Sequence, residues 1–160
     1  MPALSLTRRS AFLTLAGASL LTCRSAFAAE GLPKMVVTKD PTCGCCSGWV
    51  EHIRAAGFEV EVLETTQVNR VKTRLRVPRD LASCHTAEVG GFVIEGHVPA
   101  SAVRRLLSEN PQAVGLAVPG MPVGSPGMEV EGTTPEVYEV VLFGSFGQRV
   151  FARFRGGQQI

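Results

Sequence analysis

The apolar positions beyond residue 34 have two different spacings. The β-branched run at 35–38 and the alternating segment at 58–63 are typical of strands. Between them, the apolar residues from Trp49 to Ala56 have helical spacing, and Gly57 follows where a helix commonly ends. The pattern therefore predicts a strand–helix–strand unit at the start of a domain.

The rest of the chain continues the alternation of helices and strands. Helices are predicted at 67–76 and from Pro99 to Leu107, and a strand is predicted at 91–95. A glycine- and proline-rich segment, in which no regular structure is expected, precedes two strands at 138–143 and 149–154 that form a hairpin. The order predicts an α/β sandwich with a mixed sheet and a C-terminal β-hairpin.

The first residues have the features of an export signal. An arginine pair precedes the apolar stretch 11–21, which is shorter than the roughly 20 residues that a membrane-spanning helix needs. The small–x–small triplet 26–28 resembles a signal-peptidase site. We expect 1–28 to be an export signal, of the twin-arginine or the general secretory type, and 29–160 to be one domain. A lipid anchor at Cys23 is the alternative fate of the leader.

The charge of the chain changes when the leader is removed. The full chain has 16 basic and 14 acidic residues and a net charge of +2. Without the three basic residues of the leader, 13 against 14 leave −1. The basic run 70–79, which includes Lys72, indicates the solvated face of an amphipathic helix. His52 is likewise expected to be solvated. We expect no nucleic-acid partner and no stable membrane insertion after the signal is removed.

Four cysteines carry the chemistry that the sequence suggests. Cys43, Cys45 and Cys46 lie between the first strand and the first helix, and Cys84 precedes His85. The start of a helix favours thiolates and lowers the pKa of a cysteine. The Cys-x-x-Cys spacing of the first and third cysteines suits a redox dithiol, but the middle cysteine is superfluous for that role. Consecutive thiolates instead suit bridging of several Cu(I) ions, whereas a single zinc ion usually draws ligands from separated pairs. Both interpretations stay open.

Further soft donors lie elsewhere in the chain. His85 adjoins a cysteine, and His97 follows a predicted strand. Met121 and Met128 occur in a repeated Pro-Gly-Met, where a thioether could fold over a metal ion. The alternative is that these two methionines are flexible fillers that hold the loop to the core.

Taken together, these motifs resemble the CopG-type periplasmic copper-resistance proteins, a CxCC metal-binding family once known only as a domain of unknown function. The resemblance covers about 35–151 and rests on 41–46, Trp49, 83–87, 95–100 and 115–128. It implies a thioredoxin-like fold and a multinuclear, sulfur-bridged copper cluster. It further implies that the ligands are Cys43, Cys45, Cys46 and Cys84, with His85, His97, Met121 and Met128 as additional contributors.

The expected function is therefore copper binding in the periplasm. The protein would hold Cu(I) in copper resistance, or interconvert Cu(I) and Cu(II), and would exchange copper with other periplasmic copper-handling proteins. A metal-binding protein is favoured over a copper oxidoreductase. The alternatives are a thioredoxin-like thiol–disulfide oxidoreductase that uses Cys43 and Cys46, and a protein with one structural zinc ion.

Overall fold

The computed structural model describes residues 31–160, which form one compact unit. The predicted export signal and Cys23 lie outside the described residues. No helix between residues 31 and 160 is long and apolar enough to cross a membrane. The elements, in chain order, are β1 (Met35–Lys39), α1 (Gly44–Ala55), β2 (Val60–Glu64), α2 (Val68–Arg74), the 3-10 turn η1 (Arg79–Leu81), β3 (Thr86–Val89), β4 (Phe92–Glu95), α3 (Ala100–Glu109), β5 (Gly115–Ala117), β6 (Val137–Gly144), β7 (Gly147–Arg155) and β8 (Gln158–Gln159).

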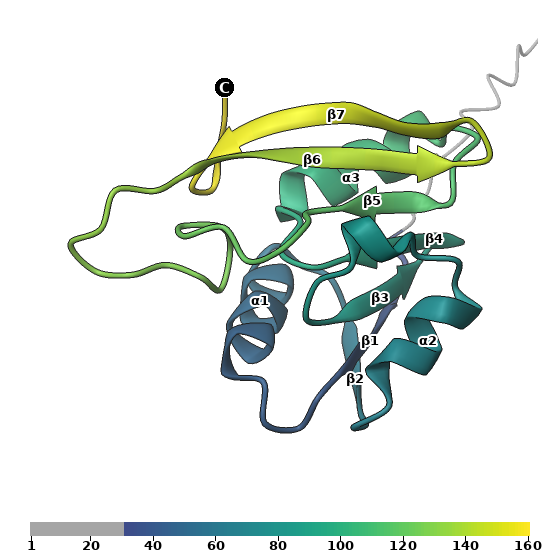
Figure 1. The fold of residues 1–160 in the computed structure, drawn as a ribbon, viewed down its shortest axis with the longest axis horizontal. Coiled ribbons are helices and arrows are strands. Elements are labelled where there is room, and N and C mark those ends of the chain that lie inside the picture. The colour runs from purple at the N-terminus through teal and green to yellow at the C-terminus, as the bar shows by residue number, and fades with distance from the viewer. Residues whose placement is uncertain (1–30) are drawn as a thin grey trace, which may run out of the picture. The chain divides into compact units, whose positions relative to one another are not determined.

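One mixed sheet contains all eight of these strands, in the order β2-β1-β3-β4-β5-β6-β7-β8 (Figure 1). β1 is parallel to β2, and β3 is antiparallel to both β1 and β4. β6 and β7 form the long C-terminal hairpin. The predicted α/β fold with a mixed sheet and a C-terminal hairpin is confirmed. The succession of a βαβ unit and a ββα unit is compatible with the thioredoxin-like sandwich that the family resemblance implied.

The two faces of the sheet carry separate apolar clusters because side chains alternate along each strand. Ile94 and Leu116 belong to the larger cluster, which includes residues of α1 and α3. Val93 and Ala117, one position away, belong to the smaller cluster on the other face. Figure 1 shows α1 and α2 on opposite sides of β1 and β3. The sheet therefore separates an α1/α3 side from an α2 side.

Three strands were missed by the sequence pattern: β3, β5 and the two-residue strand β8 at the edge of the sheet. β3 has only four residues, of which Glu88 alone is exposed, so it is too short to show the two-residue period of a strand. β5 lies at the start of the glycine- and proline-rich segment, in which no regular structure was expected. Gly115 is tolerated there because the backbone of Val93 passes so close that a side chain would clash with it.

Two side chains that were expected to be solvated are packed instead. Lys72 is 6% exposed and contacts the buried carboxylate of Glu95, because α2 directs this position toward the sheet. His52 is half-buried, and its Nε2 accepts a hydrogen bond of 3.0 Å from the backbone N–H of Ala100 at the start of α3. His52 thus satisfies one of the free amide groups of that helix.

Candidate metal centre

The turn after β1 places three sulfurs at the start of α1. Asp40 accepts hydrogen bonds from the N–H and the hydroxyl of Thr42, at 2.9 and 2.6 Å, and these bonds hold the pKa of the Asp40 carboxyl below its usual value. Cys43 is the N-cap residue of α1, so Cys45 and Cys46 lie in its first turn. The local sequence therefore gathers the three cysteines at one helix end.

Cys84 joins them from the loop between η1 and β3. The Sγ atoms of Cys43, Cys45, Cys46 and Cys84 all lie within 4.8 Å of one another. Cys45 Sγ is 3.5 Å from Cys43 Sγ and 3.9 Å from Cys84 Sγ. Residues separated by about 40 positions in the chain thus form one sulfur cluster, and the four cysteines predicted as ligands are brought together.

Two of the four sulfurs are linked. Cys43 and Cys46 form a disulfide, and Cys45 and Cys84 are free thiols. Burial and the neighbouring sulfur of Cys84 raise the pKa of the Cys45 thiol. This direction is opposite to the one predicted for a cysteine at a helix start, because loss of water around the thiol outweighs the favourable backbone contacts.

His97 lies beside the cluster in a defined tautomer. Its Nε2 is 3.0 Å from Cys84 Sγ, and its Nδ1 is 2.8 Å from the carbonyl oxygen of Pro126. Because a carbonyl only accepts hydrogen bonds, Nδ1 carries the proton and Nε2 is left as the acceptor. Burial lowers the pKa of His97, which keeps the ring neutral. Neutral imidazole with a free Nε2 is the form that binds metal ions.

His85 is buried without a polar partner. Neither ring nitrogen makes a hydrogen bond within the described part of the chain. The ring packs 4.4 Å from Trp49 and 5.1 Å from His97, measured between ring centroids. Burial lowers the pKa of His85 well below its usual value. An unsatisfied buried polar group costs about 1–3 kcal/mol. Ligand atoms of Cys84, His85 and His97 lie within 4.8 Å of one another, so a bound metal ion could satisfy this imidazole.

The segment that carries the two methionines packs onto the start of α1. A side-chain carbon added at Gly127 would lie 2.5 Å from the backbone nitrogen of Trp49 and 2.7 Å from the carbonyl oxygen of Cys45. Met128 is partly buried, whereas Met121 is 54% exposed. The exposure of Met121 argues against a role as a core filler. Both methionines lie on the segment that borders the sulfur cluster.

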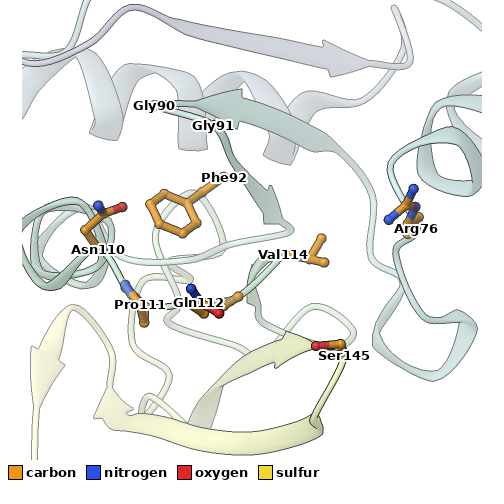
Figure 2. A pocket seen from close by; sticks show the side chains of 10 residues that line it. Arg76, Gly90, Gly91, Phe92, Asn110, Pro111, Gln112, Val114 and Ser145 are labelled. Carbon is orange, nitrogen blue, oxygen red and sulfur yellow. The ribbon is translucent and has the colours of Figure 1, made fainter.

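An open groove of about 500 Å³ lies away from these residues (Figure 2). It is lined by Gly91 and Phe92 at the start of β4, whereas His97 follows the end of that strand. None of the predicted metal ligands lines the groove. The chemistry-bearing side chains of the sequence analysis therefore gather at the other end of β4.

One buried polar group near the site was not identified from the sequence. Glu95 ends a strand that otherwise reads Phe-Val-Ile, and it is fully buried. A charged residue at the end of an apolar strand was the signal that could have drawn attention to it, because such residues are almost never buried without a partner.

Comparison with known proteins found a matching family model and similar solved structures. Residues 81–128 match the family described as "Protein of unknown function, DUF411". No curated protein matches the chain significantly. A solved structure of copper resistance protein copG, form 1, is 42% identical and has a TM-score of 0.72, covering 78% of this chain and 99% of that one. Form 2 gives the same identity and TM-score, with 77% and 98% covered. The resemblance is thereby confirmed, and the chain belongs to the CopG family of copper resistance proteins.

Proposed function

We propose that this protein binds copper in the periplasm as part of copper resistance, and that the cargo is Cu(I) held by several thiolates. The observation that carries the proposal is the group of four cysteine sulfurs within 4.8 Å of one another. Soft thiolate ligands select Cu(I) over harder ions. The similarity of the chain to two solved forms of copper resistance protein copG supports the choice of metal.

The proposed ligands fall into two groups. Cys43, Cys45, Cys46 and Cys84 supply thiolates, which can each bridge two copper ions and so build a multinuclear cluster. His85, His97, Met121 and Met128 supply imidazole and thioether donors at its border. Imidazole suits copper in both oxidation states, so its presence beside thiolates is compatible with interconversion of Cu(I) and Cu(II).

The disulfide sets a condition on this function. Cys43 and Cys46 become ligands only after two electrons have reduced their bond, since a metal ligand must be a thiolate. The oxidised protein offers two thiols, Cys45 and Cys84, with His97 and His85 beside them. We therefore expect high copper capacity in the reduced protein and low capacity in the oxidised one.

The test is an anaerobic Cu(I) titration of residues 29–160, reduced with a phosphine and competed with a chromogenic chelator. We expect two or more tightly held copper ions per chain, and fewer in Cys45→Ser. Ser47→Ala, an exposed neighbour on α1, is the matched control and should bind as the unaltered protein does. A single tightly held ion, or none, would refute the cluster. Four sulfurs around one zinc ion would lie about 3.8 Å apart, which is close to the sulfur distances of 3.5 and 3.9 Å in this cluster. The same titration therefore also measures whether zinc displaces copper.

The disulfide favours one alternative, a thiol–disulfide oxidoreductase. Cys43 at the N-cap of α1 and Cys46 one turn later are bonded in the arrangement that a redox Cys-x-x-Cys pair requires. This function predicts disulfide exchange with a model substrate that survives Cys45→Ser and Cys84→Ser but is lost in Cys46→Ser. Copper binding instead predicts that Cys45→Ser and Cys84→Ser each weaken binding, because Cys45 and Cys84 are then ligands.

A further inference from the structure

A buried ion pair lies across the sheet from the sulfur cluster. Glu95 is fully buried, and its Oε1 is 2.5 Å from the Nζ of Lys72 on α2, which is 6% exposed. Glu95 lies two positions after Val93 on β4, so the two side chains are on the same face of the sheet. Val93 belongs to the apolar cluster on the α2 side. The carboxylate thus approaches the loop of Cys84 from the face opposite to α1.

The other bonds of this carboxylate are to the segment around Cys84. Oε1 accepts a 2.6 Å bond from the backbone N–H of Ser83, and Oε2 accepts a 2.7 Å bond from the hydroxyl of Thr86. Lys72 Nζ also donates to the Thr86 hydroxyl at 3.0 Å. The antiparallel register places Thr86 directly opposite Glu95. Both ends of the segment 83–86 are therefore tied to one side chain.

Ser83 passes this restraint on to the site. Its hydroxyl donates a 2.5 Å bond to the carbonyl oxygen of Gly120, next to Met121, and lies 3.7 Å from Cys84 Sγ. The backbone N–H of Ser83 belongs to no helix or strand, so it depends on the carboxylate for a partner. Fixing Ser83 consequently fixes both the thiol of Cys84 and the start of the segment 120–128, which carries Met121 and Met128.

Stability alone does not explain a buried pair of this kind. Removing both charges from water is unfavourable, and apolar residues of the same size are often as stabilising as a buried ion pair. What the apolar residues could not supply is an acceptor for the Ser83 N–H.

We propose that Glu95, paired with Lys72, is the positioning residue for Cys84: it holds the segment 83–86 so that the Cys84 thiol meets Cys45 and His97. Its importance for metal binding rests on the proposed function of the sulfur cluster, whereas its effect on the place of Cys84 does not. Loss of the acceptor should release Cys84 even when the fold is intact.

Two double variants isolate the acceptor from the charge. Lys72→Met with Glu95→Leu removes both charges and the acceptor. Lys72→Met with Glu95→Gln is equally uncharged, but its amide oxygen can accept from Ser83 and its amide nitrogen can donate to Thr86. The first variant is the test and the second is its matched control. Urea unfolding of each establishes that the fold is retained.

The first readout needs no metal. Starting from the protein with the Cys43–Cys46 disulfide, diamide oxidises Cys45 and Cys84: the two thiols give up two electrons and two protons, which reduce the diazene to a hydrazine, and a second disulfide forms. Its rate, followed by mass spectrometry of proteolytic peptides, reports how often the two sulfurs meet. We expect disulfide formation in Lys72→Met/Glu95→Leu (the Leu variant) to be at least tenfold slower than in the unaltered protein. In Lys72→Met/Glu95→Gln (the Gln variant) the rate should be within threefold of that in the unaltered protein.

Anaerobic Cu(I) titration of the reduced variants is the second readout. Weaker binding in the Leu variant alone, together with slow cross-linking, supports the proposal. Equal cross-linking rates in the two folded variants overturn the positioning role. Unchanged copper binding in a Lys72→Met/Glu95→Leu protein that cross-links slowly overturns the importance of this position for metal binding. If the unaltered protein binds no copper, slow cross-linking still supports the positioning role while the proposed function fails.

A measurement on the native protein covers the case in which the Leu variant does not fold. Hydrogen exchange followed by NMR should show the Ser83 amide to be protected at least 100-fold relative to an unstructured amide. Ala82, whose N–H bonds to the Arg79 carbonyl in the 3-10 turn, provides a neighbouring reference. Exchange of the Ser83 amide at the unstructured rate would overturn the proposal.

Discussion

The repeated Pro-Gly-Met offers a comparison between two glycines in the same sequence context. Gly120 and Gly127 both have left-handed backbones, with φ of +69° and +83°. A side chain at Gly120 would meet nothing within 4 Å. A side chain at Gly127 would lie 2.5 Å from the Trp49 backbone nitrogen and 2.7 Å from the Cys45 carbonyl oxygen. Alanine at each position therefore separates backbone strain from a clash with α1.

The expected magnitudes follow from these two contributions. A left-handed backbone costs a residue with a side chain about 1–2 kcal/mol, which both variants share. The clash at Gly127 is with main-chain atoms, which cannot rotate away, and overpacking of this kind adds about 1–3 kcal/mol. We expect Gly120→Ala to lower the free energy of unfolding by ~1–2 kcal/mol, and Gly127→Ala to lower it by ~2–5 kcal/mol.

Urea unfolding of residues 29–160 measures both values, and histidine NMR shows whether the segment lifts off α1 instead. If it does, the bond between His97 Nδ1 and the Pro126 carbonyl is lost, and the defined tautomer of His97 is lost with it. Equal unfolding free energies for the two variants, within about 0.5 kcal/mol, with the His97 tautomer intact in both, would refute the reasoning that this segment is docked on α1.

Two further predictions concern the side chains that proved to be packed. Burial lowers the pKa of His52 below its ordinary value of 6.5, so the folded protein binds fewer protons there than the unfolded chain does. This contribution to stability is complete above pH 6.5 and is lost as the pH falls toward the folded pKa. The amide oxygen of Gln can still accept the hydrogen bond from Ala100, so His52→Gln should lose less unfolding free energy than the unaltered protein between pH 7 and pH 5, measured by urea unfolding. An identical dependence on pH in the two proteins would contradict a lowered pKa for His52. Lys72→Met leaves the carboxylate of Glu95 buried and unpaired, which should cost about 3–5 kcal/mol in the same assay. Adding Glu95→Gln should recover most of that loss, and no recovery would argue against the pair.

The sequence predicted the cysteine cluster because spacing and chemistry coincide in it. Three sulfurs at a strand–helix junction are placed by local structure alone. The addition of Cys84, some 40 residues later, came from the family resemblance, since no local pattern shows that the loop before β3 reaches α1. The order β2-β1-β3-β4 brings the two segments together, and periodicity carries no information on strand order.

The partners of individual side chains were beyond the sequence for a different reason. Lys72 belongs to a basic run that has the appearance of a solvated face, and only the packing of a seven-residue helix on the sheet turns it inward. The disulfide between Cys43 and Cys46 was one of two open interpretations, because the same spacing serves metal binding and redox exchange. Raised and lowered pKa values followed burial, which is a property of the assembled fold.

The two chemistries considered for the sulfur cluster are coupled through the same atoms. A thiolate of Cys43 or Cys46 that is bound to copper cannot form the disulfide, and a disulfide sulfur offers no thiolate to copper. Anything that binds one state and not the other shifts the equilibrium between them by mass action. We therefore expect Cu(I) to make the Cys43–Cys46 pair harder to oxidise, and oxidation to release copper. In the oxidised state Cys45, Cys84 and His97 stay together. After oxidation has released copper, the site thus keeps metal-binding side chains beside Cys43 and Cys46, whose thiolates are restored when the disulfide is reduced.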